Sequence, residues 1–283
     1  MIRPNVIDLT VKLALREDVG SRDITSSAII PKNTMVKAEI EAKASGILCG
    51  IEIAETVFRF VDENLRFLPV GKDGDTLEPG QEIAYIEGSA ASVLVAERTA
   101  LNFLSHLSGI STLTRQFVDK VKGTGAKILD TRKTTPNLRI LEKYAVKTGG
   151  GTNHRAGLYD QILIKDNHLK ILRNEKIVDI VAQAKRSALK NVPVGIEVKN
   201  LKELAEALKS KASYILLDNM DPARVKECLQ VRVQSGSKIP FEVSGGITLE
   251  NVRSYAELGV ERISIGALTH TAPALDISLD IVG

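Results

Sequence analysis

The sequence predicts an α/β fold in which an N-terminal α/β domain precedes an open, incomplete α/β barrel. After Lys122, apolar strand candidates alternate with helical segments, and an alternation of this kind builds a parallel sheet. Six strands are clear and a seventh candidate lies near residues 152–155, which is fewer than the eight strands of a closed barrel. The chain before Lys122 has a different pattern, with short strands and turns. A doubly wound sheet is the alternative fold.

The first elements are predicted from turns and periodicity. Residues 36–49 have a strand pattern with a turn near Ser45-Gly46. Residues 53–60 are expected to form a short helix, and residues 77–88 a turn followed by an alternating strand. These elements form the frame of the N-terminal domain.

A long helical segment joins this domain to the barrel. Helical periodicity covers residues 93–122, with Gly109 as the expected break. We therefore assign residues 1–108 to the N-terminal domain and residues 109–270 to the catalytic barrel. The C-terminal tail, residues 271–283, is expected to pack with the N-terminal domain.

The barrel elements are predicted from apolar runs and helix caps. Asn200 with Glu203 forms a capping pair, Asp221 caps a helix that begins at Pro222, and Thr248 is expected to cap the helix after it. The strand candidates are Ala126–Asp130, Gln161–Ile164, Val194–Val198, Tyr214–Leu217, Pro240–Val243 and Arg262–Ile265.

Composition excludes several classes of protein. The chain is 43% hydrophobic and 26% charged, as in ordinary globular domains. A net charge of +3, with no Trp, six Phe and five Tyr, gives little basic surface or base stacking for nucleic acid. No stretch approaches the roughly 18 uninterrupted apolar residues of a membrane span. We expect neither a nucleic-acid partner nor a membrane partner.

Cysteine use and the first residues indicate the compartment. Cys49 and Cys228 lie far apart and outside any CxxC or His spacing, so we expect no disulfide framework and no zinc site. Met1 leads into Pro4 and Asp8 without an apolar run, and we expect no signal peptide. A cytoplasmic location is therefore predicted.

Every strand candidate of the barrel ends in polar residues. Because the carboxyl ends of parallel barrel strands open onto one face, these residues are expected to surround a single active-site mouth. They are Asp130-Thr-Arg132-Lys133, Lys165-Asp-Asn-His168, Glu197, Asp218-Asn219, Ser244-Gly245-Gly246 and Ser264-Ile265-Gly266.

Two glycine turns near the end of the barrel predict a phosphate site. Ser244-Gly-Gly246 precedes the helix expected at Thr248, and Gly266 ends the next strand. Late barrel loops beside a helix N-terminus often bind phosphate. The alternative is ordinary turn chemistry.

Two carboxylates, Glu197 and Asp218, end neighbouring strands. They suit Mg²⁺, which takes one or two carboxylates together with substrate oxygens. They could equally bind sugar hydroxyls or face developing positive charge, or pair structurally with Lys133 or Lys165. His154 and His168 lack metal-ligand spacing and are not predicted to bind zinc.

The charge is concentrated in one window. Residues 130–168 contain seven Lys or Arg and four acids, so this window carries the whole net charge of +3. A local basic region in an otherwise neutral chain favours a small anionic ligand. Within the window, Arg139, Lys143 and Lys147 are spaced along one helix face and are expected to face water.

Several of these motifs resemble the quinolinate phosphoribosyltransferase family. The resemblance runs from about residue 10 to residue 275, and its most specific strings are Thr-Arg-Lys-Thr-Thr-Pro136 and Lys-Asp-Asn-His168. Asn137 stands where this family usually has Gly, but Asn also tolerates left-handed backbone geometry. Further matching strings begin at Glu17, Glu97, Leu141, Gly149, Asn153, Glu197, Leu217 and Ser244.

The resemblance implies a reaction and an architecture. Quinolinate attacks 5-phosphoribosyl-1-pyrophosphate through its ring nitrogen, which yields nicotinate mononucleotide, pyrophosphate and CO2 for de novo NAD synthesis. Mg²⁺ is required and no organic cofactor is needed. The family fold is an N-terminal α/β domain with an open seven-stranded α/β barrel, assembled as a homodimer or larger homo-oligomer with shared active sites.

The resemblance also implies residue roles. Arg132, Arg155 and Lys165 bind the two carboxylates of quinolinate, with Arg98 of the neighbouring subunit and His154 nearby. Arg suits bidentate capture of a carboxylate.

The phosphoribosyl side takes the remaining residues. Lys133 meets the pyrophosphate, while Glu197 and Asp218 take Mg²⁺ and the ribose hydroxyls and face the oxocarbenium-like transition state. With Lys165, these three form the expected catalytic set. The 5-phosphate is assigned to Ser244, Gly245, Gly246, Ser264, Ile265 and Gly266.

Three alternatives remain. A molybdenum-transport-associated relative of this family would share the fold. A nicotinate-using transferase would bind one carboxylate and need fewer cations. A non-catalytic sugar-phosphate-binding regulator would not need both Glu197 and Asp218 beside the phosphate turns.

Overall fold

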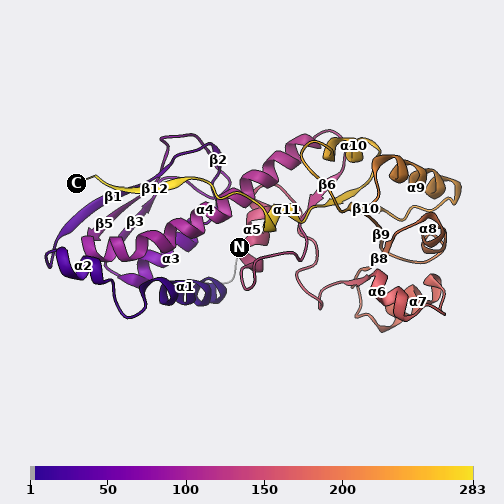
Figure 1. Ribbon diagram of the computed structural model, residues 1–283, viewed down its shortest axis with the longest axis horizontal. Coiled ribbons are helices and arrows are strands. Elements are labelled where there is room, and N and C mark those ends of the chain that lie inside the picture. The colour runs from indigo at the N-terminus through magenta and orange to yellow at the C-terminus, as the bar shows by residue number, and fades with distance from the viewer. Residues whose placement is uncertain (1–3, 283) are drawn as a thin grey trace. The chain divides into compact units, whose positions relative to one another are not determined.

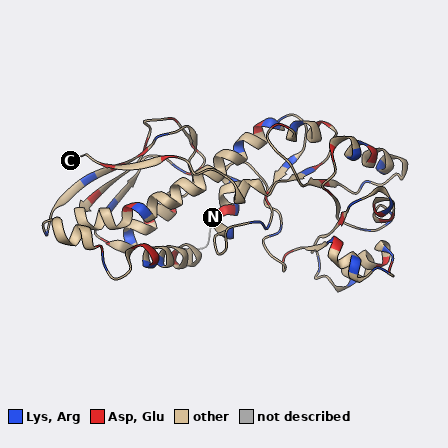
Figure 2. Cartoon of the chain, in the orientation of Figure 1, with Lys and Arg blue, Asp and Glu red and all other residues tan. Residues whose placement is uncertain are grey.

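The computed structural model describes residues 4–282 and divides the chain into two compact units (Figure 1). The first unit combines the described residues up to Arg115 with Thr134–Gly150 and the chain from Leu268 onward. The second combines Gln116–Lys133 with Gly151–Ala267. Acidic and basic residues are interspersed over the helices of both units (Figure 2). None of the described helices combines the length and apolar composition that crossing a bilayer requires.

The first unit is built on an antiparallel sheet with strand order β12-β1-β5-β3. Its strands are β1 (Met35–Ala42), β3 (Arg66–Pro69), β5 (Glu82–Ser89) and β12 (Ile277–Ile281), and a second antiparallel pair joins β2 (Gly46–Ile47) to β4 (Thr76–Leu77). The last strand of the chain therefore lies beside β1, with Ala38 paired to Ile281 (Figure 1).

Helices supply the rest of the first core. Alternate residues of β1 and β5 are buried, as expected for a sheet with one covered face. The ring of Phe58 on α3 lies 5.6 Å from that of Phe67 on β3, which fixes α3 against the sheet. The helices that begin in this part of the chain are α1 (Pro4–Val19), α2 (Ile24–Ile29), α3 (Ile51–Val61), α4 (Ala90–Lys120) and α5 (Arg139–Thr148).

The expected helix break at Gly109 is wrong. Helix α4 continues through this residue to Lys120. A Cβ atom at Gly109 would lie 2.0 Å from the carbonyl oxygen of Pro273. Glycine stands here because the C-terminal segment passes directly against the helix, and not because the helix ends.

The second unit contains the predicted parallel sheet. Its strand order is β6-β11-β10-β9-β8-β7, and every neighbouring pair is parallel. The strands are β6 (Lys127–Leu129), β7 (Ile162–Ile164), β8 (Val194–Val198), β9 (Tyr214–Asp218), β10 (Phe241–Ser244) and β11 (Arg262–Ser264). The six clear strand predictions are confirmed.

The seventh strand position is reduced to one bridge, in which Thr152 pairs in parallel with Leu129 of β6. Among the described residues, no strand joins this edge to β7 at the other edge of the sheet. The sheet therefore stays open, and the predicted incomplete barrel is confirmed.

Helices alternate with the barrel strands, as predicted. Asn200 accepts a hydrogen bond from the backbone N–H of Glu203 at 3.0 Å, and Asp221 accepts one from Arg224 at 2.8 Å, so both predicted caps are confirmed. The helices are α6 (Asp166–Ile171), α7 (Ile177–Ser187), α8 (Leu201–Ala207), α9 (Pro222–Gln234), α10 (Val252–Glu257) and α11 (Ala267–His270).

The cap predicted at Thr248 is wrong. Helix α10 starts only at Val252, and the backbone N–H of Thr248 donates to the side chain of Asn251 at 2.8 Å. The side chain of Asn251 therefore closes a turn between the glycine pair and the helix, and this turn delays the helix start.

Candidate functional site

The polar residues that end the barrel strands lie at one end of the sheet. Ser244 pairs in register with Asp218 on one side and with Ser264 on the other. Ser264 in turn pairs with Leu129, which Asp130 follows. Since all six strands run in the same direction, their carboxyl ends form one mouth.

The carboxylates of Glu197 and Asp218 influence each other at this mouth. Burial raises the pKa of Glu197, the negative charge of Asp218 raises it further, and the ammonium group of Lys165 opposes both. Lys165 Nζ lies 3.6 Å from Glu197 Oε2. Two adjacent carboxylates with one cation beside them are a suitable place for further positive charge.

This pair fits a magnesium ion only in part. The described residues contain no group of three or more His, Cys, Asp or Glu placed to hold a metal. Mg²⁺ can be bound by one or two carboxylates if substrate oxygens complete its coordination. The donor set of Glu197 and Asp218 fits that mode of binding.

Lys165 stands between a strand and a short helix whose start is well anchored. The backbone N–H of Lys165 donates to His168 Nδ1 at 2.9 Å. Asp166 accepts hydrogen bonds from Lys199 at 2.8 Å and from Lys170 at 3.1 Å, and these bonds lower the pKa of its carboxyl. His168 thus stabilises the start of α6.

Arg132 and Arg155 bring two positive charges close to each other in the second unit. Arg155 is 8% exposed, and its Nη1 donates to the carbonyl oxygen of Gln161 at 3.2 Å. Burial lowers the pKa of Arg155, and the charge of Arg132 lowers it further. Two guanidinium groups that repel each other are well suited to a dianionic ligand. Lys133, which follows Arg132 in the sequence, is exposed.

His154 is held from three directions. Its backbone N–H donates to Asp130 Oδ1 at 2.8 Å, and its Nδ1 accepts from the backbone N–H of Arg155 at 2.7 Å. Its Nε2 lies 3.2 Å from Oε1 of Glu242. Glu242 was not predicted, because a single acid inside a strand gives no local signal of its contacts.

The glycine turn after β10 has the backbone geometry that glycine allows. Gly245 and Gly246 have φ angles of +97° and +62°. A Cβ atom on Gly245 would lie 2.2 Å from Oδ1 of Asn219, whereas one on Gly246 would meet no atom within 4 Å. Gly246 is exposed, so its backbone is open to a ligand.

The residues that follow β11 are more closely engaged within the barrel. The hydroxyl of Ser264 donates to Glu242 at 2.5 Å, and the backbone N–H of Ile265 donates to the carbonyl of Leu129 at 2.9 Å. Both residues are buried, and Gly266 is half-buried. The exposed part of the expected phosphate site is therefore the Ser244–Gly246 turn.

Arg98 lies on α4 in the first unit. Its side chain is 62% exposed, and its Nη2 lies 3.8 Å from Glu97 Oε1. A contact of this length between exposed groups stabilises little. The guanidinium group thus remains accessible to a ligand or to another chain.

The predicted solvent-facing arrangement of the α5 cations is wrong for Lys143. Lys147 is exposed, but Lys143 is only 5% exposed, and Arg139 is half-buried with its Nε donating to Thr134 Oγ1 at 2.9 Å. Helix α5 also buries Glu142 completely. Even spacing along a helix could not reveal that this face is covered by other parts of the chain.

Glu142 is a second buried acid that the sequence did not indicate. Its Oε2 accepts from the backbone N–H of Thr135 at 3.1 Å, and its Oε1 lies 3.0 Å from His106 Nε2. It therefore anchors the segment after the Arg132-Lys133 pair. Asn137, in the same segment, has a φ of 67°, so the expected left-handed geometry is confirmed.

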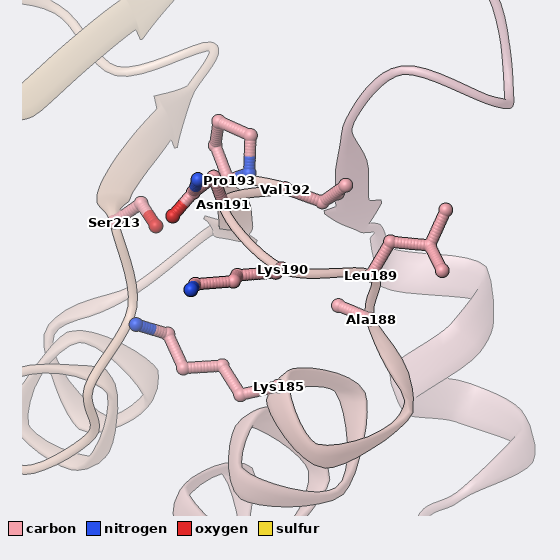
Figure 3. Close-up of a pocket in the computed structure, with 8 residues that line it drawn as sticks. All are labelled: Lys185, Ala188, Leu189, Lys190, Asn191, Val192, Pro193 and Ser213. Carbon is pink, nitrogen blue, oxygen red and sulfur yellow. The ribbon is translucent and has the colours of Figure 1, made fainter.

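A separate basic pocket lies away from this mouth. Lys185 and Lys190 extend toward Ser213 from one side of it (Figure 3). Ser213 accepts from the backbone N–H of Val194 at 3.0 Å, at the start of β8. The pocket is thus at the amino ends of the strands and takes no part in the candidate site.

Comparisons with known proteins identify relatives over nearly the full chain. The protein-family model described as "Quinolinate phosphoribosyl transferase, N-terminal domain" matches residues 23–108. The family model of the corresponding C-terminal domain matches residues 110–280. Similar sequences include a "Probable nicotinate-nucleotide pyrophosphorylase [carboxylating]" of Bacillus subtilis, which is 43% identical over 94% of this chain and 90% of its own length. The "Nicotinate-nucleotide pyrophosphorylase [carboxylating]" of Mycobacterium leprae is 41% identical over 96% of each chain. The solved structure of NadC from Streptococcus pyogenes has a TM-score of 0.92 at 38% identity and covers 100% of this chain and 99% of its own.

Proposed function

Since the chain belongs to the quinolinate phosphoribosyl transferase family, we propose that it transfers the phosphoribosyl group of 5-phosphoribosyl-1-pyrophosphate to quinolinate. The phosphoribosylated quinolinate then loses CO2, and the products are nicotinate mononucleotide, pyrophosphate and CO2, as in de novo NAD synthesis. The observation that carries the proposal is the presence of two interacting pairs in the barrel unit, the guanidinium groups of Arg132 and Arg155 and the carboxylates of Glu197 and Asp218. The two guanidinium groups would bind the carboxylates of quinolinate, and the two carboxylates would stabilise the positive charge that develops on the ribose.

Quinolinate binding is assigned to the basic residues of the mouth. Arg155 is buried and close enough to Arg132 for their charges to interact, so a dianion there would relieve their repulsion. Lys165 supplies a third positive charge from the end of β7. Together these groups would hold the pyridine ring with its nitrogen toward the ribose carbon that is attacked.

The phosphoribosyl substrate is assigned to the other side of the mouth. The 5-phosphate would lie against the open backbone of Gly246, and Lys133 would meet the pyrophosphate. Glu197 and Asp218 would bind the ribose hydroxyls and stabilise the positive charge that develops as the pyrophosphate leaves. With Mg²⁺ held by these two carboxylates and substrate oxygens, the charge of the leaving pyrophosphate would also be neutralised.

Loss of CO2 follows from the chemistry of the product. Once the ring nitrogen carries the ribose, the pyridinium accepts the electron pair of the bond to the 2-carboxylate. A proton from solvent then replaces CO2 at this carbon. No side chain is required to form a covalent bond in this step.

The assembly is proposed to be a homodimer or a larger homo-oligomer in which subunits share active sites. The exposed position of Arg98 supports this proposal, because its guanidinium group is available to the mouth of a neighbouring chain. A domain laid across the mouth would exclude water and strengthen the charge contacts inside.

The proposal is tested by supplying either quinolinate or nicotinate with 5-phosphoribosyl-1-pyrophosphate and measuring nicotinate mononucleotide. We expect product from quinolinate only. Product from nicotinate would favour the one-carboxylate transferase, and binding without any product would favour a regulator.

A further inference from the structure

The inside of the barrel holds a carboxylate that the proposed reaction does not use. Glu242 lies on β10 and is fully buried. Arg262 Nε donates to its Oε2 at 2.6 Å, Ser264 donates to its Oε1, and His154 Nε2 lies 3.2 Å from the same Oε1. Burial alone would raise the pKa of Glu242, but its contacts with His154, Arg262 and Ser264 together lower it. Glu242 is therefore a carboxylate, which can only accept hydrogen bonds.

The contacts of His154 define which nitrogen of its ring carries the proton. The backbone N–H of Arg155 points at Nδ1 from 2.7 Å, so Nδ1 must present its lone pair. The ring proton is then on Nε2, which faces the carboxylate of Glu242. The tautomer is thus assigned from both sides by a fixed donor and a fixed acceptor.

These contacts form a chain that ends at a substrate-binding residue. Glu242 holds the imidazole ring, and the ring holds the backbone N–H of Arg155. The guanidinium group of Arg155 is the buried cation assigned to quinolinate. We propose that Glu242 is a positioning residue, which acts through His154 to fix Arg155 in the orientation that receives a carboxylate of quinolinate.

This inference rests on the proposed function, and it changes the role of His154. The ring of His154 acts on Arg155 instead of donating to the substrate, since one nitrogen accepts from Arg155 and the other faces Glu242. Carboxylate–imidazole pairs orient ligating histidines in metal sites in the same manner.

Glu242→Gln tests the chain because it reverses one donor. Arg262 Nε can only donate, so the amide oxygen of Gln must face it and the amide NH2 must face His154. The ring would then have to accept at Nε2 and carry its proton on Nδ1. That proton would oppose the backbone N–H of Arg155, which loses its acceptor.

The first measurement is the binding of quinolinate by calorimetry. We expect Glu242→Gln to weaken it about 10- to 100-fold, the loss of one hydrogen bond to a charged group. The KM for 5-phosphoribosyl-1-pyrophosphate should stay close to that of the unmodified protein. Unchanged quinolinate affinity in the variant would overturn the inference, whereas absence of binding by the unmodified protein would instead contradict the proposed function.

A double-mutant comparison separates positioning from a general loss of stability. His154→Asn keeps an acceptor for the N–H of Arg155 and gives up the contact with Glu242. In that background Glu242→Gln should cause little further loss of quinolinate affinity, because contacting residues are energetically coupled. If the losses of quinolinate affinity caused by the two single substitutions multiply in the double variant, Glu242 acts independently of His154 and the inference is wrong.

A third measurement does not depend on the variants folding or on the substrate. The chain has four histidines, so the ring nitrogens of His154 can be assigned by nitrogen-15 NMR of the unmodified protein. The expected result is a neutral ring protonated on Nε2. A ring protonated on Nδ1 would contradict the proposed chain of contacts.

Discussion

Replacing Gly246 with Ala should impair the use of 5-phosphoribosyl-1-pyrophosphate and cause only a modest loss of stability. Gly246 has a φ of +62°, and a Cβ atom there would meet no protein atom within 4 Å. The substitution then lowers the stability of the fold only because Ala disfavours the left-handed backbone conformation, which costs about 1–2 kcal/mol. A phosphate on this backbone would meet the new methyl group directly. Loss of one hydrogen bond to a charged group is about 1.5–3 kcal/mol, or about a 10- to 100-fold rise in KM.

Gly236→Ala is the matched control for this variant. Gly236 has a φ of +67° and equally open surroundings, but it follows α9 and precedes β10, away from the mouth. The assay compares the thermal unfolding of both variants with their KM for 5-phosphoribosyl-1-pyrophosphate at saturating quinolinate. We expect similar losses of stability and a raised KM for Gly246→Ala alone. A similar KM for both variants would refute the assignment of the phosphate to this turn.

Three further predictions test other parts of the site. Arg132→Ala should weaken quinolinate binding by about 2–5 kcal/mol, on the order of 30- to 5,000-fold, with the fold intact by circular dichroism; unchanged affinity by calorimetry removes Arg132 from the pocket. Because the pKa of Glu197 is raised above 4.5 in the folded protein, ionising this group opposes folding as pH rises through that range. The thermal stability of Glu197→Gln relative to the unmodified protein should therefore rise from pH 4 to pH 7. A difference in thermal stability that does not change with pH would count against a buried carboxylate beside Asp218. When inactive Arg98→Ala and Glu197→Ala chains re-form dimers at random from equal amounts, about a quarter of all sites should regain activity; confirmed subunit exchange without recovery would place Arg98 in its own chain's site.

The strands of the barrel could be predicted because their signals are local. Val194–Val198 is a mostly apolar run that Lys199 follows, and the structure has β8 over the same residues. Parallel strands covered on both faces give such runs. The polar residues at the carboxyl ends of such strands then mark the mouth, so the pair of Glu197 and Asp218 is predictable from the sequence.

The errors arose where a residue's partner is distant in the sequence. Gly109 resembles a helix break, but its partner is Pro273. Lys143 has the spacing of a solvent-facing residue, yet it is buried. Glu242 contacts His154, and also Arg262 and Ser264 of β11, so its partners come from two other segments, and no local pattern reports such a network. Tertiary contacts override local periodicity at these positions.

The resemblance to the family, taken from short motifs, is confirmed by both domain models. The resemblance could assign Arg132, Arg155 and Lys165 to the binding of quinolinate, because they lie in the matching motifs. It could not show that Arg155 is held by the ring of His154 at 2.7 Å. That contact belongs to the folded barrel, and it is the basis for the role proposed for Glu242.

The most direct test of the proposed reaction is the release of labelled CO2 from quinolinate carrying the label in its 2-carboxylate. We expect release only when 5-phosphoribosyl-1-pyrophosphate is present, in equal amounts with pyrophosphate and nicotinate mononucleotide. Transfer must precede loss of CO2, because the electron pair of the broken bond is accepted by the pyridinium ring. Labelled CO2 formed without 5-phosphoribosyl-1-pyrophosphate, or nicotinate mononucleotide formed without labelled CO2, would contradict the account.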